Sequence, residues 1–410
     1  MQPILFRNLN LLDPRWDEAR PGYEVLVEGD TIREVSAGPI RSDSAETIDC
    51  GGHTLMPGLI DCHVHVTLTE LSLGAMEAMP LTLMTARAAR SLEDMLNRGF
   101  TTVRDTGGAD WGIQKAVEEG LFAGPRLFVS GQSIGPTGGH NDSRRRTDTG
   151  KGCVCSNALQ FTSAVADGAD EVRRVVREQL RQGANQIKIM CSGGVSSPFD
   201  PLDSLQFSLS EIEAAVEEAT AFGRYVLAHA YTPEAIVRAA NAGVRTIEHG
   251  NLIDLPAAQL MAERGVFLVA NLVTYFSMKE RAADFGMSAE MLAKNDIVLE
   301  GALRSLEICK AAGVEVAFGS DLLGPLQEDQ SLEFLHRAEV LSPIEIIRQA
   351  TLVGARVVER EGSLGIIEPG AVADLLLVEG DPLADLRLLT DQGEHLAVIM
   401  QSGRFHKRTS

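Results

Sequence analysis

The sequence predicts an α/β protein: a (β/α)8 TIM barrel with a small β-sandwich domain formed by both termini. Two observations support this prediction. From residue 59 onward, short apolar segments alternate with amphipathic stretches, the pattern of βα units around a parallel sheet. The two ends of the chain instead carry strand-like segments separated by turn residues. We therefore expect a barrel over residues 58–359 and a composite β domain from residues 1–57 and 360–410.

Segments of the middle region have the length and the apolar character of buried strands. They are Leu59–Val66, Thr101–Asp105, Arg126–Ser130, Gln186–Met190, Tyr225–Ala230, Arg245–His249, Val266–Ala270 and Glu315–Ser320. Between them, helices are clearest at Ser91–Arg98, Asp170–Arg181 and Ser210–Ala221, where apolar residues recur at helical spacing. Ser210 and Glu213 predict a capping box at the start of the last of these helices.

The terminal segments resemble each other more than they resemble the middle. Strands are expected at Ile4–Leu11, Tyr23–Glu28, Thr31–Val35 and Glu46–Leu55, and again at Ala373–Val378 and Leu396–Gln401. Glycine and proline turns such as Gly51-Gly52 and Gly380-Asp381-Pro382 separate them. Because the two ends share this β character, we expect them to form one small domain together.

Composition excludes several classes of partner. The chain has 37 Lys and Arg against 57 Asp and Glu, a net charge of −20, which disfavours nucleic acid and anionic membranes. No apolar run approaches the roughly 18 residues of a membrane span, and the N-terminus lacks the pattern of a signal peptide. The six cysteines are scattered, as in a reducing compartment. We expect a cytoplasmic protein.

Polar residues recur at the ends of the predicted barrel strands, where active sites of such barrels lie. Alternation along the first strand puts Asp61, His63 and His65 on one face. Lys188 has the interior-facing parity of the fourth strand. His229 and His249 end the fifth and sixth strands, and Asp321 follows the eighth.

This set of residues predicts a site for two divalent metal ions. Imidazole favours zinc over magnesium or calcium. Burial favours the neutral amine of Lys188, which can react with carbon dioxide to give a carbamate that bridges two metals. We expect His63, His65 and Asp321 on one ion, His229 and His249 on the other, carboxylated Lys188 between them, and a bridging hydroxide.

These motifs resemble the amidohydrolase superfamily. The resemblance rests on Met56-Pro57-Gly58-Leu59-Ile60-Asp61-Cys62-His63-Val64-His65, Lys188, His229, His249 and Ser320-Asp321. The segments around Lys188, His229 and His249 are similar to the prolidase-like branch, which is related to imidazolonepropionase and comprises binuclear dipeptidases and carboxypeptidases. Amidases that cleave ochratoxin A look similar as well. Related proteins are commonly oligomers, so we expect a homo-oligomer.

The resemblance implies hydrolysis of the amide bond to a C-terminal amino acid, in dipeptides, Xaa-Pro substrates or N-acyl amino acids. Asp321 would act as general base and then acid. His140 would donate to the developing oxyanion, and Tyr231 would bind the substrate carboxylate or carbonyl. Arg104 could pair with a substrate carboxylate or with Asp105. The arginine run Arg144-Arg145-Arg146, in the loop 141–157, is expected to be a solvated surface segment or to attract anionic substrates. The role of Cys153 and Cys155 in the same loop stays open.

Three alternatives remain open at this stage. A mononuclear deaminase of the same superfamily would lack Lys188 and would use a nearby glutamate, whereas Glu248 is expected to face away from His249. A cyclic-amide hydrolase of the imidazolonepropionase or dihydroorotase type would keep Lys188 and differ only in its substrate loops. A metal-free scaffold protein would have lost ligand histidines, and none is missing here.

Overall fold

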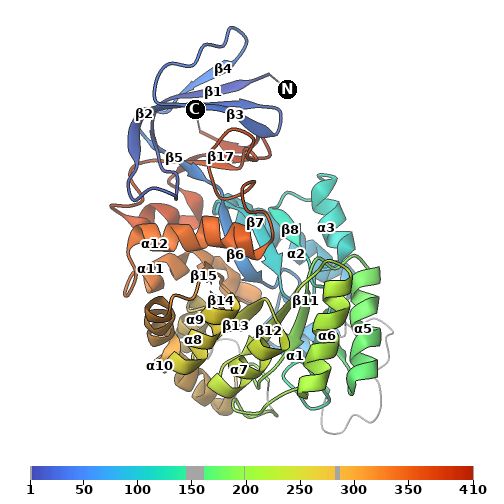
Figure 1. Cartoon of the computed structure of the whole chain (residues 1–410). Helices are drawn as coiled ribbons and strands as arrows, with labels where there is room; N and C mark the ends of the chain where they lie inside the picture. The colour runs from blue at the N-terminus through green and yellow to red at the C-terminus, as the bar shows by residue number, and fades with distance from the viewer. Residues whose placement is uncertain (1, 145–160, 198, 282–286, 410) are drawn as a thin grey trace.

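The computed structural model describes residues 2–144, 161–197, 199–281 and 287–409. It contains the predicted (β/α)8 barrel with a β domain built from both termini, as Figure 1 shows. In that view both ends of the chain lie in the β domain. None of the helices in the described part of the chain combines the length and the apolar character that a membrane span requires.

The barrel is built from parallel strands in two hydrogen-bonded groups. One has the order β6-β7-β8 and the other β10-β9-β11-β12-β13-β14-β15, in which the short strands β9 and β10 are additional to the eight barrel strands. Backbone contacts join the groups on both sides: Asp321 N donates to His63 O at 2.8 Å, and Asn185 N donates to Val129 O at 2.7 Å. The bounds are β6 Leu59–Val64, β7 Phe100–Asp105, β8 Arg126–Phe128, β9 Ser133–Gly135, β10 Ser163–Val165, β11 Ile187–Met190, β12 Val226–Ala230, β13 Thr246–His249, β14 Phe267–Ala270 and β15 Val316–Phe318.

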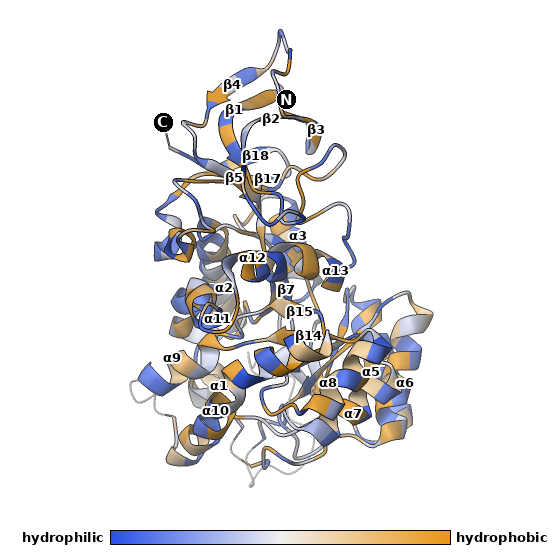
Figure 2. Ribbon diagram, turned by 60° about the vertical axis from the view of Figure 1, so that its left-hand side comes forward, coloured by the Kyte–Doolittle hydropathy of each residue, from blue (hydrophilic) through white to orange (hydrophobic). Residues whose placement is uncertain are grey.

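Helices surround the barrel, and those of the βα units carry mixed hydrophilic and hydrophobic residues (Figure 2), as expected when one face packs on the strands. They are α1 Leu73–Ala78, α2 Leu81–Asn97, α3 Trp111–Glu118, α5 Ala169–Arg181, α6 Leu209–Ala221, α7 Pro233–Ala242, α8 Leu255–Arg264, α9 Val273–Arg281, α10 Ala289–Ala312, α11 Glu333–Arg337, α12 Pro343–Arg348 and α13 Gly354–Val357. Short 3-10 and π turns complete the chain at η2 Gly324–Leu332, η3 Gln349–Val353, η4 Leu386–Leu389 and η5 Asp391–Gly393.

The start of α6 corrects one prediction. The capping box is formed by Ser208 and Glu211, two residues earlier than Ser210 and Glu213. Glu211 also accepts a hydrogen bond from the backbone N–H of Gly168, the residue before α5. The earlier start lets one carboxylate serve two helix N-termini, a contact that the spacing of apolar residues in α6 does not reveal.

The β domain is a single connected sheet rather than two separate sheets of a sandwich. Its order is β18-β17-β16-β5-β1-β2-β3, with β4 pairing to β1. The strands are β1 Ile4–Leu11, β2 Arg20–Glu28, β3 Thr31–Ser36, β4 Glu46–Asp49, β5 Thr54–Pro57, β16 Leu375–Val378, β17 Leu396–Gln401 and β18 Arg404–Arg408. Antiparallel pairing of β16 with β5 joins the two termini. The domain boundaries at residues 57/58 and 359/360 stay a prediction.

Candidate active site

One cavity at the carboxyl ends of the barrel strands collects the predicted site residues. The side chains that line it include His63, His65, His140, Lys188, His229, Tyr231, His249 and Asp321. Apolar residues from the loops after β6 and β15 and from α9 line it as well, among them Leu71, Met278 and Leu326. The cavity therefore combines a polar floor with partly apolar walls, as expected of a small-molecule site.

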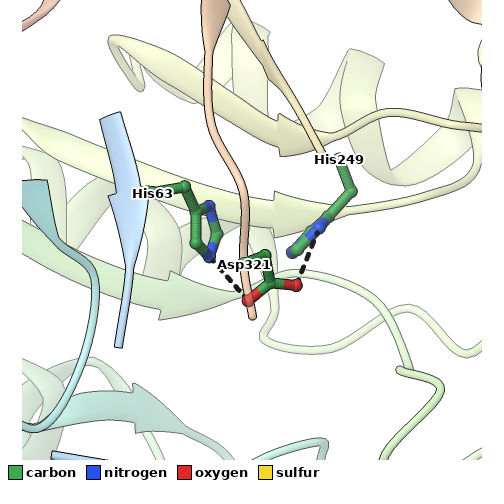
Figure 3. A group of neighbouring side chains, drawn as sticks. All are labelled: His63, His249 and Asp321. Carbon is green, nitrogen blue, oxygen red and sulfur yellow. Dashed lines mark ion pairs between the residues drawn. The ribbon is translucent and has the colours of Figure 1, made fainter. Parts of the chain in front are cut away.

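Asp321 lies at the centre of the polar cluster. Its Oδ1 is 3.2 Å from His63 Nε2 and 3.2 Å from His65 Nε2, and its Oδ2 is 3.7 Å from His249 Nδ1. Donor atoms of His63, His249 and Asp321 all lie within 4.8 Å of one another. Figure 3 shows these three side chains pointing toward one another from separate strand ends. Imidazole and carboxylate donors in this arrangement can hold a divalent ion such as zinc.

Each of the four rim histidines has one ring nitrogen held by a protein group. These contacts are His63 Nδ1 to Glu248 Oε2 at 2.7 Å, His65 Nδ1 to Gly107 O at 2.9 Å, His229 Nε2 to Gly193 O at 2.9 Å, and His249 Nδ1 to Tyr275 Oη at 3.0 Å. Such contacts fix the ring orientation of metal-binding histidines. For His63 and His65 the second nitrogen, Nε2, faces Asp321, whereas His249 faces Asp321 with the same Nδ1 that contacts Tyr275. His63 Nε2 is buried, and although Asp321 Oδ1 lies 3.2 Å away, it makes no contact of hydrogen-bond geometry among the described residues. A metal ion would satisfy it.

Lys188 projects into the same cavity from β11 and is 2% exposed. Within the described part of the chain, its Nζ makes no hydrogen bond or ion pair. Burial lowers the pKa of Lys188 to about 8, although Glu248 and Asp321 act in the opposite direction. A buried lysine without a partner is costly unless it is neutral or modified. Its surroundings thus fit the expected carbamate.

The electrostatics of the cluster favour neutral rings at His229 and His249 and an ionised carboxylate at Asp321. Burial alone would raise the pKa of Asp321, but the neighbouring His63 and His65 outweigh it and hold that pKa well below its usual value. Burial drives the pKa values of His229 and His249 well below their ordinary range. Neutral imidazole and ionised carboxylate are the protonation states in which both groups bind metals.

Two residues of the site adopt backbone angles that break the alternation of a regular strand. His249 has φ of 75° and Asp321 has φ of 53°, values uncommon for non-glycine residues. As a result, Glu248 and His249 both reach the cluster: Glu248 contacts His63, while His249 lies beside Asp321. The expectation that Glu248 faces away was therefore wrong.

Asp61 does not join the histidines that alternation placed on its face. The pairing of β6 with β7 shifts register between Asp61 and Val64, which interrupts the simple period of two. The buried carboxylate of Asp61 accepts hydrogen bonds from Ser320 Oγ at 2.6 Å and from Gln330 Nε2 at 2.8 Å. Asp61 thus fixes the segment that carries Asp321.

Arg104 also lies where sequence reasoning did not put it. It is fully buried, does not line the cavity, and donates to both carboxylate oxygens of Glu248 at 2.8 and 2.9 Å. It pairs with Glu248 instead of Asp105. This placement contradicts the expectation that Arg104 meets a substrate carboxylate. Its contact with Glu248, which in turn holds His63, makes it a support of the cluster.

The two expected substrate contacts do line the cavity. The His140 ring stacks on His229 with centroids 4.5 Å apart. Tyr231 Oη lies 3.0 Å from the hydroxyl of Tyr275, which sequence analysis missed. Tyr275 belongs to α9 rather than to a strand end, so the strand-end criterion could not select it.

The predicted arginine run lies mostly outside the described residues, as do Cys153 and Cys155. Of the run, Arg144 alone is described, and it pairs with Asp142 at 2.6 Å. Asp142 lines the cavity.

Known proteins of similar sequence and structure support an assignment to a family. The model of the amidohydrolase family matches residues 54–404. An ochratoxinase of Aspergillus niger is 31% identical over 361 residues, 82% of this chain and 72% of the relative. A prolidase in complex with N-methylphosphonate-L-proline is 46% identical with a TM-score of 0.97, covering 99% of this chain and 100% of that one. An Xaa-Pro dipeptidase with bound methionine is 29% identical with a TM-score of 0.89, over 99% of this chain and 100% of that one.

The family match spans most of the chain and includes the barrel strands together with β5, β16 and β17 of the β domain, whereas β1 to β4 precede it. The donor set of the cavity agrees with it, because histidine rings and a carboxylate converge at the rim where this family's fold places its chemistry. The chain belongs to the amidohydrolase family, and it is a metal-dependent, prolidase-like hydrolase.

Proposed function

We propose that this enzyme hydrolyses the amide bond to a C-terminal amino acid, in dipeptides of the Xaa-Pro type or in N-acyl amino acids. The observation that carries the proposal is the convergence of His63, His65 and His249 on the carboxylate of Asp321, in a cavity where each of the four rim histidines is also held by a protein contact. The similar proteins act on bonds of this type by name: a prolidase, an Xaa-Pro dipeptidase and an ochratoxinase.

Two divalent ions, zinc by preference of the donor set, would be held by His63, His65, Lys188, His229, His249 and Asp321, with Lys188 carboxylated. When bound, the ions supply Lewis acidity that activates water and polarises the scissile carbonyl. Two observations support this ligand set: His63 Nε2 is buried beside Asp321 without a contact of hydrogen-bond geometry, and burial lowers the pKa of the Lys188 amine. Which ligand belongs to which ion stays a prediction.

The protein's own groups would handle protons and charge. Asp321, kept ionised by its histidine neighbours, accepts the proton of the attacking water and returns it to the departing nitrogen. Burial raises the pKa of the Tyr231 phenol, so it keeps its proton and acts as a donor to the substrate carbonyl or carboxylate. Burial lowers the pKa of His140 to about 4, so a neutral ring faces the substrate and donates to the oxyanion.

A hydrolysis screen tests the proposed function. The metal-loaded protein is offered dipeptides, N-acyl amino acids and cyclic amides, and released amino acids are measured. We expect products from the linear amides with a free C-terminal carboxylate, and none from the same compounds amidated at that carboxylate. Products from lactams or cyclic ureas alone would overturn the proposed substrate class and leave the family assignment intact. A cytoplasmic location and a homo-oligomeric state remain predictions.

A further inference from the structure

A buried lysine behind the cavity has backbone oxygens as its partners. Lys294 lies in the second turn of α10 and is 8% exposed. Its Nζ donates to the carbonyls of Asp200 at 2.6 Å, Ser197 at 2.9 Å and Gly194 at 3.4 Å. Within the described residues, no carboxylate pairs with it. A desolvated ammonium is costly, so three converging carbonyls indicate that the amine serves to hold this loop.

The loop that Lys294 holds follows β11 and shapes two residues of the cavity. The Gly193 carbonyl accepts from His229 Nε2 at 2.9 Å. The Ser197 hydroxyl lies 2.7 Å from His140 Nδ1. Gly194 packs directly against the His140 ring, since a Cβ at that position would lie 2.0 Å from His140 Cε1. Displacement of this loop would therefore move the contacts that orient His140.

The hydroxyl of Ser197 has one hydrogen and two neighbouring acceptors. His140 Nδ1 lies at 2.7 Å and Gly194 O at 3.3 Å. Lys294 also donates to Gly194 O, so that carbonyl has a donor even when the serine turns to the histidine. When Ser197 donates to Nδ1, the hydrogen of the neutral imidazole resides on Nε2. His140 can then donate from Nε2.

We propose that Lys294 is a positioning residue that holds the backbone at Gly194, Ser197 and Asp200 so that Ser197 fixes the tautomer and orientation of His140 for donation to the substrate. The inference rests on the proposed function, in which His140 contacts the reacting carbonyl. It adds a residue from α10, about 100 positions away in sequence from the loop that it holds. The side chain of Lys294 itself does not line the cavity.

The first test is Lys294→Met, which keeps an unbranched side chain, one atom shorter, and removes the donors. We expect kcat to fall about 10- to 100-fold, with KM changed by less than about threefold, because the lost donation acts in the transition state. Bound metal should be unchanged. Lys310→Met is the matched control, since Lys310 lies on the same helix but is exposed and pairs with Glu345. It should retain wild-type kinetics.

A double-mutant cycle separates positioning from general destabilisation. In a His140→Ala background, Lys294→Met should cause no further loss of kcat, because its effect passes through His140. Ser197→Ala should reproduce the loss with little change in stability, and it serves if Lys294→Met folds poorly. An equal loss in both backgrounds, or wild-type kcat in Lys294→Met and Ser197→Ala, would overturn the proposal.

Hydrogen exchange tests the positioning without any substrate. The Gly194 amide donates to Asp200 Oδ2 at 3.1 Å, and it should exchange faster in Lys294→Met, with exchange elsewhere in the barrel unchanged. Unchanged exchange of the loop would overturn the positioning role. A wild-type enzyme inactive on every linear amide would instead refute the proposed function, and the exchange result would still decide the role of Lys294.

Discussion

Two clusters of buried charge in this barrel differ in how completely the protein satisfies them. The Arg337 cluster, formed by Arg337, Glu333 and Gln349, lies beside β14 and β15. Arg337 donates to Glu333 at 2.7 Å, to Gln349 and to the carbonyls of Ala270 and Ala317. Glu333 also accepts from the backbone N–H groups of Leu272 and Val273. Every group in these contacts has a protein partner, as expected of a structural pair.

The rim cluster around Asp321 is buried to a similar degree but is left incomplete. Among the described residues, His63 Nε2 makes no contact of hydrogen-bond geometry although Asp321 Oδ1 lies 3.2 Å away. The amine of Lys188, a side chain that is 2% exposed, has no protein acceptor there. Both clusters contain a carboxylate and a buried basic side chain, so residue type alone does not separate them. Between these two clusters, the incomplete contacts lie in the one at the cavity, because a buried polar group without a partner is costly unless something else binds it.

The largest expected effect is at the centre of the rim cluster. Asp321→Asn removes the base and a proposed metal ligand, and kcat/KM should fall by about 10³-fold or more, with folding retained. Kinetics and thermal unfolding measure the two effects. Asp203→Asn, in an exposed position of a rim loop, is the control and should be neutral. Activity above a tenth of wild type in Asp321→Asn would contradict the role.

The Arg337 cluster should respond in the opposite way. Arg337→Met leaves Glu333 buried without its ion pair, and the free energy of unfolding should fall by about 3–5 kcal/mol. Metal bound per folded molecule should not change, since no group of this cluster lines the cavity. Urea unfolding and metal analysis check both outcomes. Loss of metal from a well-folded Arg337→Met variant would abolish the distinction between the clusters.

The stability of the Arg337 cluster should also depend on pH. Burial raises the pKa of Glu333 to about 7, against the opposing effect of Arg337. Between the pKa of glutamate in the unfolded chain and about pH 7, the folded state binds more protons than the unfolded state. The stability that protonated Glu333 contributes is therefore present at low pH and is lost as pH rises. Relative to Glu333→Gln, the wild type should lose at most about 3 kcal/mol between pH 4.5 and pH 7. Urea unfolding of both proteins across this range measures the difference, and parallel pH curves would refute it.

The smallest expected effect concerns the group behind His63. Glu248→Gln keeps the shape of the side chain but weakens its hold on His63 Nδ1, so metal affinity should fall about 10- to 100-fold. Competition with a chelator measures this affinity. An unchanged affinity would show that Arg104 and Glu248 serve the scaffold alone.

The sequence predicted the site residues best where they lie on regular strands. The barrel strands and the positions of His63, Lys188, His229 and Asp321 at their carboxyl ends could be predicted from alternation and from the placement of turns. The prediction failed where the backbone leaves that regularity. The positive φ of His249 lets two consecutive residues, Glu248 and His249, face the barrel interior, and the register shift in β6 separates Asp61 from the histidines.

Contacts between residues far apart in the sequence could not be predicted either. Lys294 sits in a helix of 24 residues and Tyr275 near the start of α9, where lysine and tyrosine suit many ordinary helix surfaces. Only the fold brings Lys294 to the loop after β11 and Tyr275 to His249. The same holds for Arg104, whose partner Glu248 is 144 residues away.

The most direct measurement is an anomalous diffraction map of crystals of the metal-loaded enzyme. We predict two metal peaks at the rim among His63, His65, His229, His249 and Asp321, with extra density for a carbamate on Lys188 between them. A bare Lys188 amine with no metal peak beside it would contradict the account.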